Sequence, residues 1–334
     1  MKTKKVWAII LVVLVVALSA VAFVACDKGE NDTIDVVIVD GAPALAVANL
    51  MREFKTYENY TINYKVVGGA DALSDAITNG EADIAIAPTN LGAKFYNSGI
   101  DIKLASTNIQ GLLYMVGKTE VASLNELVGK VVYNIGRGQT PDLTFKYILQ
   151  QKGIEYVDSE TPVEGKVALH YVSSGGELIP LLKAGKAQYG ILGEPAVTKA
   201  KAAAGVQEIF NIQALWNEVT NSNANFPQAS TFVLGKYNDA EYSALINAFI
   251  TKMEENVTFM NSSAENLTLA IDAVKALYKD TATANVNINN IGRCNLKVVK
   301  AQDAKTSVTT YLTVLHGFNA KSIGGSVPGD AFFY

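Results

Sequence analysis

Short apolar runs alternate with amphipathic stretches along most of the chain. The runs are rich in Val, Ile and Tyr and have strand length, whereas the stretches between them repeat apolar residues at helical spacing. The predicted strands are Ile34–Val39, Tyr60–Val67, Ile84–Ala87, Leu112–Val116, Val131–Tyr133, Ala168–Val172, Tyr189–Leu192 and Thr231–Leu234. The predicted helices are Ala44–Tyr57, Ala70–Asn79, Leu124–Val128, Pro141–Lys152, Gly176–Ala184, Val197–Ala204, Ala240–Asn256 and Ser263–Lys279.

This alternation of strands and helices indicates the fold class. Segments such as Val36–Val39 are apolar on both faces, as a sheet covered by helices on both sides requires. We therefore predict an α/β fold in which each sheet is mainly parallel and flanked by helices.

Two segments repeat the same order of features. Residues Tyr64–Pro88 and His170–Pro195 each contain a strand, a Gly-Gly turn, a helix, a Gly-x-Ala turn and a second strand that ends near a proline. The repeat predicts two similar lobes within one chain.

The first residues indicate export from the cytoplasm. Three lysines precede residue 6, and Val6–Ala25 then carries no charge, which is typical of a signal peptide. The run is also long enough for an uncleaved membrane-spanning anchor. Phe23–Cys26 resembles a bacterial lipobox, which implies a signal peptide over residues 1–25 and a lipid on Cys26. Residues 26–33 are polar and predict a flexible tether.

Composition narrows the chemistry. The formal charge of −4 and the lack of a basic stripe argue against a nucleic-acid partner. With Cys26 carrying lipid, Cys294 has no cysteine with which to form a disulfide. There are only two histidines, and no metal-ligand spacing or nucleophile–base pair is evident, so we expect no metal, no cofactor and no catalytic residue.

Several short motifs carry a family resemblance across nearly the whole chain after the tether. They are Asp40–Ala44, Gly80–Asn90, Gly136–Pro141, Gly193–Pro195 and Phe226–Ser230. In their order and spacing they resemble the type II periplasmic binding proteins of nitrate, sulfonate, taurine and thiamine-precursor ABC importers. The resemblance implies two crossings between lobes, near Ile109–Tyr114 and Ala229–Leu234. Lobe one would comprise residues 34–111 and 232–334, and lobe two residues 112–231.

Turns between strands and helices are the candidate ligand contacts. Ligands of open α/β sheets bind beyond the carboxyl ends of the strands, where helix N-termini present unsatisfied N–H groups. Arg137 adds a planar cation that suits an oxyanion, and Trp216 is a candidate cleft wall. Ordinary turn geometry and N-capping remain the alternative for these residues, and lobe packing is the alternative for Glu194. The candidates are Gly41, Ala42, Pro43, Gly68, Gly69, Pro88, Thr89, Asn90, Arg137, Gln139, Thr140, Ser173, Ser174, Gly175, Glu194 and Trp216.

Together these features predict an extracytoplasmic binding protein. We expect a lipid-anchored monomer at the bacterial cell membrane that captures a small polar or anionic solute by hinge closure and passes it to an ABC permease. Sulfonate, nitrate and pyrimidine-like solutes remain open. The alternatives are a solute-sensing lipoprotein and an enzyme of thiamine or menaquinone precursor synthesis on the same fold.

Overall fold

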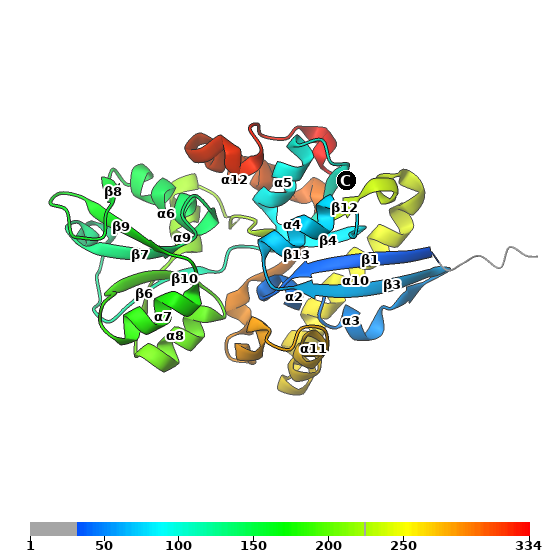
Figure 1. Ribbon diagram of the computed structural model, residues 1–334, viewed down its shortest axis with the longest axis horizontal. Helices are drawn as coiled ribbons and strands as arrows, with labels where there is room; N and C mark the ends of the chain where they lie inside the picture. Colours follow the sequence, from blue (N-terminus) through cyan, green and yellow to red (C-terminus); the bar gives the residue numbers. More distant parts are fainter. Residues whose placement is uncertain (1–31, 224) are drawn as a thin grey trace, which may run out of the picture.

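The computed structural model describes residues 32–223 and 225–334, which form two α/β lobes (Figure 1). Helices labelled α are α-helices, and those labelled η are 3-10 helices. The chain begins in lobe one with β1 (Asp32–Val39), α2 (Ala42–Leu45), α3 (Leu50–Glu53), β2 (Thr56–Tyr57), β3 (Tyr60–Val67), α4 (Ala70–Thr78), β4 (Ile84–Pro88), α5 (Thr89–Asn97) and β5 (Ile102–Ile109).

Lobe two is the next part of the chain and is one continuous segment. It comprises β6 (Leu113–Gly117), η1 (Leu124–Leu127), β7 (Val131–Ile135), α6 (Thr140–Gln151), β8 (Tyr156–Asp158), β9 (Val167–Val172), α7 (Gly175–Lys183), β10 (Tyr189–Gly193), α8 (Ala196–Ala204), β11 (Gln207–Asn211) and α9 (Ile212–Thr220).

The rest of the chain returns to lobe one. It comprises β12 (Ala229–Leu234), η2 (Gly235–Asn238), η3 (Ala240–Tyr242), α10 (Ser243–Ser262), α11 (Ala264–Leu277), η4 (Ala282–Asn285), η5 (Ile291–Cys294), β13 (Leu296–Lys300), α12 (Ala301–Asn319), η6 (Ala320–Ile323) and η7 (Asp330–Phe332).

Each lobe is built on one mixed sheet. The order is β13-β5-β12-β4-β1-β3-β2 in lobe one and β11-β6-β10-β7-β9-β8 in lobe two. β4, β1 and β3 run parallel, as do β10, β7 and β9, and the antiparallel strands β12 and β6 lie beside these triplets. The sequence predicted the two-lobed α/β fold, and the structure confirms it with a larger share of antiparallel pairs than expected.

The internal repeat is confirmed. In lobe one, the repeat consists of β3, α4 and β4, and β1 lies between its two strands in the sheet. In lobe two, the repeat consists of β9, α7 and β10, and β7 lies between its two strands. The two copies therefore present equivalent turns at the carboxyl ends of equivalent strands.

The two crossings lie side by side. The first runs from β5 to β6, and the second lies between α9 and β12. The Gln228 amide donates to the Ile109 carbonyl (2.8 Å), and the Leu112 amide donates to Gln228 Oε1 (3.1 Å). β12 pairs with β4 and β5 along its whole length, so the chain re-enters lobe one at Ala229, slightly before the expected boundary at residue 231.

Some expected elements differ in detail. The helix expected over Ala44–Tyr57 is divided into α2 and α3, and its last residues form β2. The tether expected over residues 26–33 overlaps β1 at Asp32, and its other residues, like the signal peptide and Cys26, lie outside the described part.

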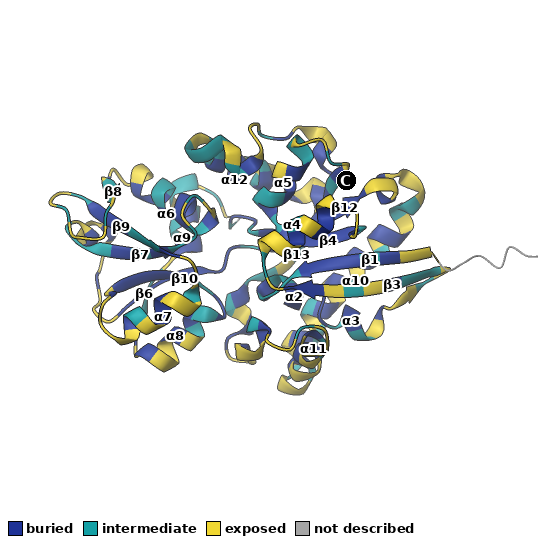
Figure 2. Ribbon diagram, viewed as in Figure 1, coloured by how far each residue is buried: buried dark blue, intermediate teal, exposed yellow. Residues whose placement is uncertain are grey.

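The core of each lobe lies between its sheet and its helices. Figure 2 shows the strands mostly buried and the outer helix faces exposed. No helix among the described residues is long and apolar enough to span a membrane. α12 contacts α6 of lobe two as well as β5 and β13 of lobe one, so it bridges the two lobes.

Candidate functional site

The candidate site is a cavity of about 590 Å³ between the lobes. It is lined by the turns that follow β1, β3 and β4 in lobe one and β7, β9 and β10 in lobe two, and by the two crossings. These turns open α4, α5, α6, α7 and α8, so backbone N–H groups with partial positive charge lie on both sides of one space.

The lobe-one wall is shaped by the turn after β1. Gly41 has a φ of 97°, a conformation that favours glycine, and Pro43 occupies the first turn of α2. The Asp40 carboxylate accepts hydrogen bonds from the Thr281 hydroxyl and from the Ala282 amide (2.9 Å). Asp40 therefore ties the turn to η4.

The lobe-two wall presents neutral polar groups. Gln139 lies at the N-cap of α6. Gln139, Thr140 and Gly175 all line the cavity. The Thr140 hydroxyl lies 2.7 Å from the hydroxyl of Tyr311 on α12, and Tyr311 is fully buried. This bond links the start of α6 to the bridging helix.

Glu194 occupies the turn after β10 and is paired across the lobes. Arg293 of η5 donates from Nε to Glu194 Oε1 (2.6 Å), and its Nη1 lies 2.7 Å from Glu208 Oε2. Its guanidinium lies 4.1 Å from the ring centroid of Tyr114. Burial lowers the pKa of Arg293, but the hydrogen bonds to Glu194 and Glu208 outweigh it and raise that pKa above its ordinary value.

Glu194 also holds the first turn of α8. Its carboxylate accepts from the Thr198 amide (3.1 Å) and from the Thr198 hydroxyl (3.2 Å). These bonds and the Arg293 pair give the Glu194 carboxylate a structural role at the joint between the lobes, which is the packing alternative foreseen for it.

Nine of the sixteen candidate contacts line the cavity. They are Gly41, Ala42, Pro43, Pro88, Asn90, Gln139, Thr140, Gly175 and Glu194. The structure brings these residues together from five separate turns, and their contact with solute remains a proposal.

Arg137 is not among the residues that line this cavity. Its side chain is 66% exposed and forms an ion pair with Asp158, and its guanidinium lies 5.4 Å from the Tyr171 ring centroid. Burial raises the pKa of Asp158, but the Tyr171 hydrogen bond and the charges of Lys146 and Arg137 lower it overall. Arg137 thus belongs to a network with Asp158, Tyr171 and Lys146 of α6.

Six other candidates also lie outside the cavity lining. Thr89 is fully buried and bonds to the Ser230 hydroxyl (2.8 Å), and Trp216 is buried against Phe226 and Tyr311. Ser174 caps the start of α7, because its hydroxyl accepts from the Glu177 amide, and the Glu177 carboxylate in turn accepts from the Ser173 amide. The remaining three are Gly68, Gly69 and Ser173.

Several polar lining residues were not among the candidates from the sequence. Asp71 lies in the first turn of α4, and Lys94 lies in the last turn of α5. Lys94 shares a helix face with the candidate Asn90 at i, i+4 spacing, so this spacing could have found it. Gln228 lies within the motif Phe226–Ser230. Lys321 and Ser322 come from η6, and no local signal points to them.

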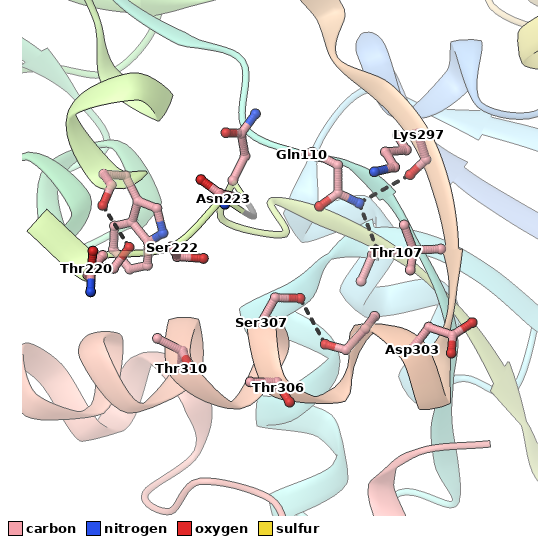
Figure 3. Close-up of a pocket in the computed structure, with 15 residues that line it drawn as sticks. Thr107, Gln110, Thr220, Ser222, Asn223, Lys297, Asp303, Thr306, Ser307 and Thr310 are labelled. Carbon is pink, nitrogen blue, oxygen red and sulfur yellow. Dashed lines mark hydrogen bonds between the residues drawn. The ribbon is translucent and has the colours of Figure 1, made fainter. Parts of the chain in front are cut away.

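A second cavity of about 570 Å³ lies on the other side of the crossings (Figure 3). Gln110 points toward it and donates to Thr107 Oγ1 (2.8 Å) and to the Lys297 carbonyl (3.1 Å). Ser307 and Thr310 of α12 form its other side. Trp216, which also lines it, packs on Phe226 and Tyr311, and Tyr311 bonds to Thr140 of the first cavity.

The first cavity offers hydrogen bonds and charge but no group arranged for metal binding. Within residues 32–223 and 225–334, no cluster of three His, Cys, Asp or Glu side chains is placed to hold a metal ion. Among its described lining residues there is also no histidine, cysteine or aromatic side chain. The arrangement suits reversible capture of a small polar molecule.

Solved structures share this fold. The chain resembles a crystal structure described as an ABC transporter from Parabacteroides distasonis, with a TM-score of 0.73 and 24% identity over 90% of this chain and 98% of that one. It also resembles the periplasmic aliphatic sulphonate binding protein SsuA from Escherichia coli (TM-score 0.65, 12% identity, 89% of each chain). A putative sulfonate-binding protein from Methylobacillus flagellatus gives a TM-score of 0.58 at 13% identity over 88% of each chain.

These likenesses establish the two-lobed periplasmic binding protein fold. No protein-family model and no curated protein sequence matches the chain.

Proposed function

We propose that this protein is the solute-binding component of an ABC importer, which holds one small polar solute between its lobes and delivers it to a membrane permease. The observation that carries the proposal is the convergence of helix N-termini from both lobes on one cavity beside a double crossing. Solved structures of the same fold include proteins described as sulfonate-binding components of such importers, which supports the same role here.

Capture by hinge closure follows from how the cavity is divided. Its two walls belong to different lobes, and the lobes are joined by two adjacent crossings. A solute that contacts both walls binds more tightly when the lobes are together, so it shifts the population toward the closed form. The permease would then distinguish closed from open forms.

We further propose that the protein is anchored outside the cytoplasm through a lipid on Cys26 and acts as a monomer. β1 begins at Asp32, and its carboxyl end at Val39 leads into the cavity. A strand of this length places Asp32 about 25 Å from the cavity end of β1. The chain therefore enters lobe one on the side away from lobe two (Figure 1). A tether there leaves the cavity accessible.

No catalytic step belongs to this proposal. The Glu194 carboxylate is held by Arg293 and Thr198, and the Asp40 carboxylate by Thr281 and the Ala282 amide. Both carboxylates fix the walls of the cavity.

A thermal unfolding screen tests the proposal. The purified protein is heated with alkanesulfonates, aminoalkanesulfonates, nitrate or pyrimidines, and a true solute at about 100 times its Kd should stabilise the fold by about 2.7 kcal/mol. Ala70→Trp, which places a ring at the cavity wall, should abolish this gain. Ala72→Trp, exposed on the same helix but not lining the cavity, is the matched control. Stabilisation that survives Ala70→Trp would place binding elsewhere, and no stabilisation by any solute would refute capture.

A further inference from the structure

The lobe-one wall of the cavity carries opposite charges at its two ends. Lys94 lies on α5, which follows β4, and Asp71 lies on α4, which follows β3. β1 separates these two strands in the sheet, so the two turns lie two strand spacings apart, or about 10 Å. Asp40 lies between them, but its carboxylate is bonded to η4.

The end near α5 is cationic. η6 packs on α5, where Asn90 Nδ2 donates to the Ser322 carbonyl (3.3 Å) and Asn97 Nδ2 donates to the Ile323 carbonyl (2.6 Å). This packing brings Lys321 beside Lys94 at the cavity. Neither ammonium group forms an ion pair with a described residue.

A buried hydroxyl at the same end has no partner. Ser322 lines the cavity, and its Oγ is buried without a hydrogen-bond partner among the described residues. Leaving such a group unpaired is unfavourable. An oxyanion placed between the two ammonium groups would supply the missing acceptor.

The opposite end is anionic. Asp71 is exposed in the first turn of α4 and lines the cavity, and no described residue forms an ion pair or a side-chain hydrogen bond with it. Its carboxylate therefore remains available to a cation in the cavity.

The other surfaces of the cavity add no charged side chain that lacks a partner. The Glu194 carboxylate is ion-paired with Arg293, and Gln139, Thr140 and Gly175 are neutral. The apolar contacts come from aliphatic residues such as Leu91, Ile109, Leu112 and Ile135, and no described lining residue offers an aromatic ring on which a flat solute would stack.

We infer that the solute is an aliphatic zwitterion, whose oxyanion end lies at Lys94, Lys321 and Ser322 and whose ammonium end lies at Asp71. This inference rests on the proposed capture between the lobes and names the class of solute captured. Two charges of opposite sign on one wall would favour such a molecule over a simple anion. A simple anion would leave the Asp71 carboxylate without a partner and would be repelled by its negative charge.

Calorimetric titration with matched probes tests the inference. Aminoalkanesulfonates of two to four carbons are compared with alkanesulfonates of the same length, and ω-amino carboxylates with simple carboxylates. The amino member of the best pair should bind at least about tenfold more tightly, a difference of about 1.4 kcal/mol. The sulfonate and carboxylate pairs together identify the oxyanion.

Asp71→Asn assigns the ammonium end. It should remove most of this preference by weakening the amino member, while the simple oxyanion binds as well as before or better. Asp75→Asn, exposed on the same helix but outside the cavity lining, should change neither affinity. Equal binding of both members to the unsubstituted protein, or a preference that survives Asp71→Asn, would overturn the zwitterion while leaving capture intact. Failure of every probe, together with binding of nitrate or a pyrimidine, would also overturn it.

Discussion

Glu194 and Arg293 show how a charged residue near a cavity can serve the joint between lobes. Arg293 comes from the segment that returns to lobe one, and its partners Glu194 and Glu208 belong to lobe two. The Glu194 side chain is 1% exposed, so loss of Arg293 would leave a buried carboxylate without its counter-ion. The pair lies next to the first crossing, since the Glu194 amide donates to the Leu112 carbonyl (3.0 Å).

Cys294 follows Arg293 and should be chemically inert. Burial, with a smaller effect from Glu194, raises the pKa of its thiol to about 12. A raised pKa lowers the fraction of nucleophilic thiolate, so at pH 8 native Cys294 should hold about a thousandfold less thiolate than an unfolded cysteine. Alkylation by iodoacetamide, followed at the Cys294 peptide by mass spectrometry, should be slow in the native protein and fast in guanidinium. Similar rates in both states would contradict this burial.

The sequence located turns better than it located contacts. Gly41, Pro43 and Gln139 line the cavity because glycine, proline and N-cap chemistry act within a few residues of the chain. Arg137 and Trp216 do not line this cavity. Their side chains instead contact Asp158 and Tyr311, which are distant in sequence and were not predicted as partners. A long side chain chooses among all the neighbours that tertiary folding provides.

At the scale of elements, local pattern predicted the repeated units well. The helices expected at residues 70–79, 141–152, 176–184 and 197–204 match α4, α6, α7 and α8 to within one residue at each end. The helix expected over Ala44–Tyr57 failed because buried Asn256 of α10 donates to the Leu45 and Ala46 carbonyls and accepts from the Asn49 amide (2.9 Å each). A side chain about 200 residues away in sequence thus replaces helix hydrogen bonds.

Several elements carry no clear sequence signal. β5 buries Ser106, Thr107 and Asn108, whose polarity conceals a strand that the sequence analysis missed. The Asn108 side chain lies at hydrogen-bond distance from the Ser106 hydroxyl (3.0 Å) and from the Thr231 hydroxyl of β12 (3.1 Å), so these polar groups find partners once β5 meets β12. Such a strand becomes recognisable only through its partner.

α5 was missed for a related reason, since Gly92 weakens its helical pattern. A Cβ on Gly92 would lie 2.1 Å from the ring of Phe232 on β12, so the glycine permits close packing of helix on sheet. We expect Gly92→Ala to lower the free energy of unfolding by about 1–3 kcal/mol through overpacking. Urea denaturation measures this change.

Gly317→Ala is the matched control for this prediction. Gly317 lies within α12, and a Cβ there would meet nothing within 4 Å. This substitution should stabilise the protein by about 0.5–1 kcal/mol, because alanine favours the helix. Equal effects of the two substitutions would argue against the close contact between α5 and β12.

At the scale of the whole molecule, the repeat and the family motifs predicted two lobes, and the structure has them. The bridging position of α12 was not predicted. Its Tyr311 bonds to Thr140 in lobe two, while η6 at its end brings Lys321 and Ser322 to the cavity. The C-terminal segment therefore completes a site whose other parts come from the first 230 residues and from Ala282 of η4, and sequence order gives no sign of this return.

The central claim is that a small solute binds between the lobes at the helix N-termini. The most direct test is a crystal structure of the protein grown with the sulfonate that most raises Tm in the screen. We predict that the sulfonate lies in the cavity between α5 of lobe one and α6 of lobe two, with its oxyanion near Lys94 and Ser322. A sulfonate bound in the second cavity beside α12, or on the outer surface, would contradict the account.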